Sequence, residues 1–393
     1  MSAVEFRHVD VIFGDRPEAA LTLLDQGADR QNILEQTGQV LGVADASLAI
    51  EEGEVCVLMG LSGSGKSTLL RCVNGLNPVT RGEVRVSDGG EQVDVGRCSA
   101  RILRRLRTRR IAMVFQQFAL LPWRTVAENV GLGLELRGVR RSEREAVVRD
   151  KLELVGLAEW AGKYAHELSG GMQQRVGLAR AFATDADILL MDEPFSALDP
   201  LIRTKLQDEL LTLQQRLKKT IIFVSHDLDE ALKIGTHIAI MEGGRVVQYG
   251  EPEQIVLEPA SDYVAEFVAH MNPLHVLRGT SLMTAADELE RDGNARLLDA
   301  AGRVRLLLND QGRPAGAELD GAPVDLVTYD PDRGLDGIRQ PALIVAPTDL
   351  TLRAAIELRQ ASGQPVVLVE DGRLAGVCGD EEIYRGLLRQ TGH

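Results

Sequence analysis

The sequence has few cysteines and no long apolar run. Its four cysteines, Cys56, Cys72, Cys98 and Cys378, show no metal-ligand spacing, and we interpret them as reduced residues of a cytosolic fold. No apolar stretch reaches the roughly eighteen residues that a bilayer-spanning helix needs. The first residues, 1–7, lack the apolar segment of a signal peptide. We therefore expect a cytoplasmic protein rather than a secreted or membrane-spanning one.

The charge is strongly negative, which argues against nucleic acid as a partner. The net charge is −14 over 393 residues, a length sufficient for two or three domains. One basic cluster departs from this average: six arginines crowd into residues 101–110, where the pattern predicts an amphipathic helix leading into a strand over 111–115. This helix either contacts anionic lipid or a membrane partner, or presents a solvated face beside acidic neighbours. We favour the second interpretation.

A phosphate-binding loop is the strongest motif in the sequence. It reads Gly60-Leu61-Ser62-Gly63-Ser64-Gly65-Lys66-Ser67-Thr68, after an apolar strand over 55–59 and before a helix beginning at Ser67. Glycines allow the backbone amides to point at phosphate oxygens beside the positive end of the helix dipole. Lys66 can then reach the outer phosphates, and the Ser67 hydroxyl can hold Mg²⁺.

Two further apolar strands end in polar residues that suit nucleotide hydrolysis. The strand over 188–191 leads into Asp192 and Glu193, and the strand over 220–224 is followed closely by His226. Asp192 is suited to Mg²⁺ coordination, direct or through another ligand, and Glu193 to polarising the attacking water. We expect His226 to contact the γ-phosphate.

With these motifs in place, the chain resembles the ATPase subunits of ABC transporters from about residue 40 to residue 270. The segment 168–175, Leu-Ser-Gly-Gly-Met-Gln-Gln-Arg, looks like the family's signature motif, 196–199 like its D-loop, and Gln116 like its Q-loop glutamine. The resemblance implies a head-to-tail dimer in which each ATP lies between one chain's phosphate loop and its partner's signature motif. Consistent with this, Ser169 and Gly170 precede a helical pattern whose N-terminus can offer donors to a phosphate.

The expected fold is therefore α/β: a P-loop NTPase with a RecA-like core, an antiparallel β subdomain and a helical subdomain at about 118–184. The expected ligands are ATP and Mg²⁺. The catalytic residues would be Glu193, His226 and Gln116, and the metal ligands Ser67, Gln116 and Asp192. The nucleotide-binding residues would be Gly60, Leu61, Ser62, Gly63, Ser64, Gly65, Lys66, Ser67, Thr68, Ser169, Gly170 and Gly171.

An N-terminal insertion narrows the resemblance to one group of ABC importer ATPases. Residues 17–42 read as short helices, and the stretch 18–47 resembles the corresponding region of glycine betaine, proline betaine and choline importer ATPases, as do 196–203 and 226–231. The resemblance implies import of a quaternary ammonium compound, with a second ATPase subunit, a multispan permease and a solute-binding protein as partners, at the cytoplasmic face of the plasma membrane. Phe13 is the nearest candidate for stacking on adenine, although a core aromatic is equally consistent with its position.

The residues after about 272 form a separate region. Residues 341–390 read strand–helix–strand–strand–helix and resemble one cystathionine-β-synthase (CBS) motif. A degenerate first copy could occupy 274–320, with 284–290 as its helix and 304–308 as a strand. We accordingly divide the chain into an ATPase domain, 1–272, and a CBS-like domain, 273–393. The second either senses a ligand or ionic strength, or serves packing and dimerisation, which we favour.

Three other functions are compatible with parts of the sequence to different degrees. An ABC importer ATPase for another small solute fits the same motifs. A soluble ABC ATPase acting on nucleic acid commonly carries two ATPase domains, long coiled coils or zinc insertions, which this chain lacks. A regulator without hydrolysis would require loss of Glu193 or His226, and both are present.

Overall fold

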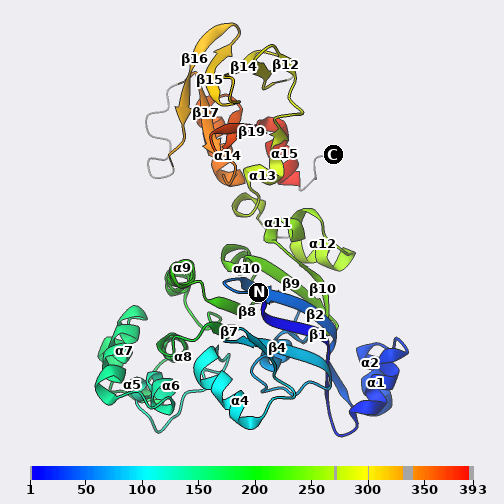
Figure 1. The fold of residues 1–393 in the computed structure, drawn as a ribbon, viewed down its shortest axis with the longest axis vertical. Helices are drawn as coiled ribbons and strands as arrows, with labels where there is room; N and C mark the ends of the chain where they lie inside the picture. The colour runs from blue at the N-terminus through cyan, green and yellow to red at the C-terminus, as the bar shows by residue number, and fades with distance from the viewer. Residues whose placement is uncertain (1, 270–271, 300, 331–339, 389–393) are drawn as a thin grey trace. The chain divides into compact units, whose positions relative to one another are not determined.

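The computed structural model describes residues 2–269, 272–299, 301–330 and 340–388. Contacts between Cα atoms divide the chain into two compact units, residues 1–251 and 252–393. The sequence predicted a boundary at 272. The helices α11 (Pro252–Leu257) and α12 (Asp262–Val268) therefore group with the second unit rather than with the ATPase domain. Each unit is described by itself below (Figure 1).

The first unit contains an antiparallel sheet with strand order β2-β1-β4-β5. Its strands are β1 (Ser2–Phe13), β2 (Val40–Glu51), β4 (Arg81–Asp88) and β5 (Glu91–Asp94). Alternating residues of β2 face inwards, as expected for a sheet with one buried face. This sheet is the predicted antiparallel β subdomain.

A second, mostly parallel sheet of order β10-β9-β3-β8-β7-β6 forms the centre of this unit. Its strands are β3 (Val55–Met59), β6 (Ile111–Val114), β7 (Ile188–Asp192), β8 (Thr220–Val224), β9 (His237–Glu242) and β10 (Arg245–Gly250). Every residue of β3, β7 and β8 is buried, because strands covered on both faces need apolar side chains in both directions. Their carboxyl ends lie at one edge of the sheet, where the predicted motifs follow them.

Helices cover this sheet and form the predicted helical subdomain. The phosphate loop leads into α3 (Lys66–Cys72). The subdomain comprises α5 (Val126–Val130), α6 (Leu132–Leu136), α7 (Arg141–Leu154), the 3₁₀ turns Ala158–Trp160 and Ala165–Glu167, and α8 (Gly170–Ala183). These helices gather to one side in Figure 1. The helices α9 (Pro200–Leu217) and α10 (Leu228–Ile234) follow β7 and β8.

The N-terminal insertion folds as the two short helices that the sequence predicted, α1 (Pro17–Asp25) and α2 (Arg30–Thr37). Asp29 caps α2 by accepting a hydrogen bond from the amide of Asn32 at 2.8 Å, and Gly38 ends it in the left-handed conformation. Both helices lie beside β1 and β2 in Figure 1.

In the second unit, the described residues form a sheet of order β11-β19-β18-β17-β16-β15-β14-β13-β12. Its strands are β11 (Thr284–Ala285), β12 (Arg291–Asp292), β13 (Ala295–Leu297), β14 (Val304–Leu308), β15 (Pro314–Leu319), β16 (Ala322–Thr328), β17 (Ala342–Pro347), β18 (Val366–Glu370) and β19 (Arg373–Cys378). Its other helical segments are the 3₁₀ turn Pro273–His275, α13 (Gly279–Leu282), α14 (Leu352–Ser362) and α15 (Asp380–Leu388).

The structure confirms the strand–helix pattern predicted for the last part of this unit and contradicts part of the pattern predicted for its first part. The order β17-α14-β18-β19-α15 matches the predicted strand–helix–strand–strand–helix, apart from Arg389, which lies outside the described residues. The strand over 304–308 is also present. The helix predicted over 284–290 is wrong: Thr284 pairs with Val377 in β11, and a turn follows. The strands β12 to β16 form an antiparallel meander instead of a strand–helix copy.

The basic cluster forms α4 (Ala100–Arg105) and a π-helical turn (Leu106–Arg110) ahead of β6. Arg105 bonds Asp88 at 2.5 Å, and Arg110 pairs with both Asp88 and Asp187. These intramolecular carboxylates support the interpretation as a solvated face. Among the described residues, no helix is both long and apolar enough to cross a bilayer.

Candidate functional site: a nucleotide site at the carboxyl ends of the parallel strands

The phosphate loop joins β3 to α3, and two of its glycines are sterically required. Gly60 has φ +137°, and a Cβ there would lie 2.1 Å from the carbonyl oxygen of Met241. Gly65 has φ +103°, and a Cβ there would lie 2.5 Å from the carbonyl oxygen of Gly42. Both positions combine positive φ with close backbone approach, which only glycine tolerates. The loop is therefore wedged between β9 and β2 in a tight conformation.

The ammonium group of Lys66 is hydrogen-bonded to the backbone of this loop. Its Nζ donates to the carbonyl oxygens of Gly60 at 2.8 Å and Leu61 at 2.9 Å, and contacts Ser64 Oγ at 3.5 Å. Burial lowers the pKa of Lys66, while the carboxylates of Glu193 and Asp192 act in the opposite direction. The ammonium is thus kept at the loop by carbonyl dipoles and by two acidic residues at the carboxyl end of β7.

The predicted metal ligands Ser67 and Asp192 meet. The Ser67 hydroxyl donates to Asp192 Oδ1 at 2.7 Å, and Asp192 is fully buried at the end of β7. Arg71 donates to the other carboxylate oxygen at 2.8 Å. Two oxygen donors side by side fit a hard cation such as Mg²⁺, which takes few protein ligands. Sequence reasoning missed Arg71, although it lies four residues after Ser67 and hence on the same face of α3.

The three predicted catalytic residues gather around one carboxylate. Gln116 Nε2 donates to Glu193 Oε2 at 3.2 Å, and His226 Nδ1 lies 3.5 Å from the same oxygen. The three side chains come from the ends of β6, β7 and β8, which are neighbours in the sheet. Gln116 makes this contact to Glu193, whereas the described hydrogen bonds connect Asp192 with Ser67 and Arg71.

The backbone of Glu193 is held in an uncommon conformation. Its φ is +47°, in the left-handed region that non-glycine residues seldom adopt and that often occurs at functional sites. Its amide donates to the carbonyl of Val224 at 3.1 Å, and its carbonyl accepts from Gln174 Nε2 at 2.9 Å and Ser196 Oγ at 3.0 Å. These contacts fix where the carboxylate points.

The signature motif starts α8. Ser169 is its N-cap and accepts from the amide of Met172 at 3.4 Å, while Ser169 and Gly170 are both exposed. A Cβ at Gly171 would lie 3.0 Å from the carbonyl oxygen of Ala197 in the D-loop. The exposed helix N-terminus is free to meet a ligand supplied from outside this chain.

Gln174 connects this motif to the catalytic strand. It is 1% exposed, donates to the Glu193 carbonyl, and accepts from the amide of Ala197 at 3.0 Å through its Oε1. Sequence reasoning gave it no role, because nothing in a helical pattern marks which polar residue faces inwards. A glutamine that bonds in both directions fixes the D-loop and Glu193 together.

A buried carboxyl group supports the loop that carries His226. Ser225 Oγ donates to Glu230 Oε2 at 2.5 Å and accepts from the amide of Asp227 at 3.0 Å. Gln207 Nε2 donates to Glu230 Oε1 at 2.9 Å. Burial raises the pKa of Glu230, and the hydrogen bonds from Ser225 and Gln207 partly oppose the rise. Glu230 therefore anchors the backbone on both sides of His226.

Phe13, the candidate adenine-stacking residue, lies at the edge of this region. It is 39% exposed, and a Cβ at Gly42 would lie 2.8 Å from Phe13 Cε2 and 3.1 Å from Thr68 Cγ2. The ring is therefore not a core aromatic. It covers Gly42 beside the start of α3.

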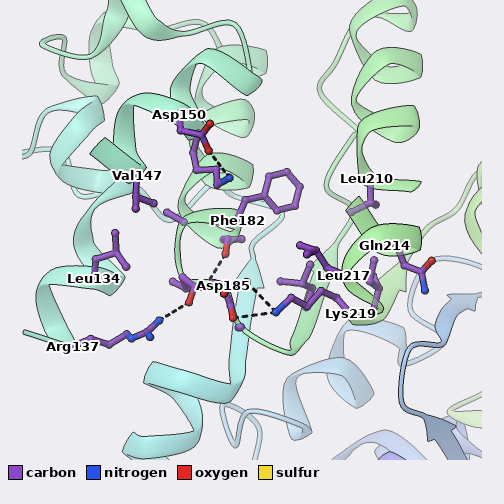
Figure 2. A pocket seen from close by; sticks show the side chains of 17 residues that line it. Leu134, Arg137, Val147, Asp150, Phe182, Asp185, Leu210, Gln214, Leu217 and Lys219 are labelled. Atoms are coloured by element: carbon purple, nitrogen blue, oxygen red, sulfur yellow. Dashed lines mark hydrogen bonds and ion pairs between the residues drawn. The ribbon is translucent and has the colours of Figure 1, made fainter. Parts of the chain in front are cut away.

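A separate cavity of about 340 Å³ lies at the opposite edge of the sheet (Figure 2). Its lining includes Ala186, just before β7, and Lys219, just before β8, whereas the nucleotide motifs follow these strands. Phe182, Leu210 and Leu217 form much of its apolar wall. Its rim cations already have partners: Lys219 pairs with Asp185 at 3.0 Å. This cavity takes no part in the nucleotide site.

Comparison with known proteins agrees with the geometry. The family described as ABC transporter matches residues 43–196, which include the phosphate loop, Gln116, the signature motif and Glu193. The glycine betaine/proline betaine transport system ATP-binding protein ProV of Escherichia coli K12 is 44% identical over 402 residues, 98% of each chain. The chain belongs to the ABC ATPase family. It is accordingly an ATP-hydrolysing subunit with the P-loop NTPase fold expected from the sequence.

Other relatives of this ABC ATPase extend the comparison. The glycine betaine/carnitine transport ATP-binding protein GbuA of Listeria monocytogenes is 41% identical, covering 96% of this chain and 95% of the relative. Among solved structures, the dimeric post-hydrolysis state of the ATP-binding cassette MJ0796, bound to ADP and Pi, is 30% identical with a TM-score of 0.54. It covers 63% of this chain and 98% of that cassette.

Proposed function

We propose that this ABC ATPase binds Mg²⁺ and ATP at the site built from the phosphate loop and the strand ends. The loop amides and Lys66 would hold the phosphates, and Ser67, Asp192 and Gln116 would hold the metal ion, which would neutralise phosphate charge. Glu193 polarises the attacking water, since its carboxylate faces the site and lies against Gln116 and His226. Ser169, Gly170 and Gly171 complete the site of a second copy in a head-to-tail dimer.

We further propose that hydrolysis drives import of a quaternary ammonium osmolyte of the glycine betaine type. The observation that carries this proposal is the 44% identity to the betaine transport protein over 98% of both chains, a span that takes in the N-terminal insertion and most of the second unit. The partners are a multispan permease and a solute-binding protein, with the ATPase at the cytoplasmic membrane face. The trimethylamine N-oxide transport protein TmoW of Ruegeria pomeroyi, 45% identical over 311 residues, makes a related methylated amine the second candidate solute.

For the second unit we propose a packing or dimerisation role, and we keep the CBS-like interpretation for residues 340–388. Its described cleft, of about 590 Å³, is lined by seven carboxylic acids and two arginines. The acids are Glu288, Glu290, Asp299, Asp320, Asp380, Glu381 and Glu382. Both arginines are already paired, Arg303 with Asp299 and Arg359 with Asp380. This charge disfavours an adenine nucleotide as ligand.

The hydrolytic role is tested with Glu193→Gln in the purified transporter. Without the carboxylate, hydrolysis should fall about 10²–10⁴-fold while ATP binding persists, because the phosphate loop is untouched. Glu143→Gln, on the exposed face of α7, is the matched control and should keep full turnover. Equal turnover in the two variants would remove Glu193 from the catalytic role.

The solute is tested by uptake into vesicles that contain the ATPase together with a permease and a solute-binding protein of a betaine importer. Radiolabelled glycine betaine, choline and trimethylamine N-oxide are compared, with sulfate as an unrelated solute. ATP-dependent uptake of a quaternary amine that is abolished by Glu193→Gln supports the proposal. Uptake confined to trimethylamine N-oxide or to sulfate would replace it.

A further inference from the structure

The N-terminal insertion is a rigid part of the first unit. Ile33 and Ala20 are completely buried, and with Leu24 they pack against Ile12 of β1 and Leu41 of β2. A closely packed apolar cluster of this kind holds both helices in one place on the sheet. The insertion is thus a fixed platform rather than a loose loop.

An arginine of the sheet also forms ion pairs that hold the insertion in place. Arg81 of β4 donates from Nε to Asp10 at 2.6 Å, and its two Nη atoms reach the carboxylate of Asp25, at the end of α1, at 2.8 and 3.0 Å. Two-pronged pairing of a guanidinium with a carboxylate fixes direction as well as distance. The position of α2, which follows α1 after a short turn, is set accordingly.

From this platform one side chain reaches the phosphate loop. Arg30, the first residue of α2, donates from Nη1 to the carbonyl oxygen of Gly63. Within the part of the chain that the structure describes, Arg30 has no carboxylate partner, although the protein carries a net charge of −14. Its guanidinium is therefore committed to the loop and not to an ion pair.

The contact is made at an exposed glycine of the loop. Gly63 has φ +79°, and a Cβ built there would meet no atom within 4 Å, so packing does not restrain this residue. In a trans peptide the carbonyl and the following N–H point in opposite directions. The amide of Ser64 already donates to the Leu61 carbonyl at 3.1 Å, so Arg30 holds the other end of the Gly63–Ser64 peptide unit at the Gly63 carbonyl.

We propose that Arg30 is a positioning residue for nucleotide binding: the insertion uses it to hold the phosphate loop in its binding conformation before ATP arrives. The proposal rests on the proposed nucleotide site. Pre-organisation of this kind lowers the entropic cost of binding without altering the chemical step. Arg30 also adds a positive charge beside the loop, to which the triphosphate is attracted.

The test compares four purified full-length variants. Arg30→Ala should raise the Kd for Mg²⁺-ATP about three- to tenfold, as expected for loss of one charge-assisted hydrogen bond, while kcat at saturating ATP stays within about twofold. Arg30→Lys, which keeps a cationic donor, should recover most of the affinity. Gln31→Ala, next along α2 and bonded to Glu35 at 2.9 Å, is the matched control. Lys66→Ala should abolish binding.

A structural measurement accompanies the affinities. Amide hydrogen exchange of residues 61–65 in the nucleotide-free protein should be faster in Arg30→Ala than in Gln31→Ala, with an equal melting temperature. Unchanged affinity and unchanged exchange in Arg30→Ala, with binding still lost in Lys66→Ala, would overturn the role of Arg30 alone. Retained binding in Lys66→Ala would instead overturn the nucleotide site.

Discussion

Asp192→Asn should separate the structural and metal-binding roles of one carboxylate. Asp192 is fully buried and accepts from Ser67 at 2.7 Å and Arg71 at 2.8 Å. The substitution removes a charge-assisted bond, worth about 1.5–3 kcal/mol, and leaves an amide group that cannot accept from both partners. Arg71 is 37% exposed, so solvent offsets part of this loss. We expect a net destabilisation of about 2 kcal/mol, or about 4–8 °C in Tm.

Tryptophan fluorescence can follow the unfolding of the first unit. The chain has two tryptophans, Trp123 and Trp160, and both lie in the first unit. Urea unfolding followed by their fluorescence therefore reports on the ATPase unit. Asp187→Asn is the matched control, because Asp187 precedes the same strand and also pairs with an arginine, Arg110, but is 50% exposed. That variant should lose less than about 0.5 kcal/mol.

The metal role gives a second readout in the same variant. Wild-type protein should bind ATP more tightly with Mg²⁺ than with EDTA, and Asp192→Asn should lose most of this difference, since one of the paired oxygen donors loses its charge. Asp187→Asn should keep it. If both variants unfolded at the same urea concentration and kept the same Mg²⁺ dependence, the assignment of Asp192 to both roles would be refuted.

Two further predictions concern the signature motif and the loop of His226. Ser169→Arg should leave the ATP affinity of the monomer within about twofold of wild type. It should prevent the ATP-induced dimers that light scattering detects, because it places bulk at the exposed start of α8. Dimers at wild-type levels would contradict the composite site. Glu230→Gln should flatten the pH dependence of stability. Burial raises the pKa of the Glu230 carboxyl in the folded protein. Its favourable contribution to stability is therefore fully present below the unfolded pKa and is lost as pH rises through the higher folded pKa. Urea midpoints between pH 5 and 8 measure this, and superimposable pH profiles for wild type and variant would argue against it.

The core of the site could be predicted because its physical signals are local. A strand buried on both faces, such as β3 or β7, is a continuous apolar run, and the phosphate loop is one contiguous segment. The position of each motif at a strand's carboxyl end then brings Ser67 to Asp192 and His226 to Glu193. Neither contact needs knowledge of tertiary packing beyond the parallel order of the strands.

The parts that sequence reasoning missed depend on packing between distant segments. Nothing near Gln174 in the sequence indicates that its amide bridges Glu193 and Ala197. The helix predicted over 284–290 has good helix formers, yet Thr284 pairs with Val377, far along the chain, and the amide of Ala286 donates to the Ala375 carbonyl at 2.8 Å. Tertiary pairing outweighs helix propensity at such a site.

The two hydrogen bonds of Gln174 have a consequence for the proposed dimer. In the proposed head-to-tail dimer, the exposed start of α8 would meet the nucleotide bound by the partner, while Gln174, one helical turn further on, holds the backbone of this chain's own Glu193. Any displacement of α8 in that dimer would therefore reach the backbone of Glu193 through a single side chain.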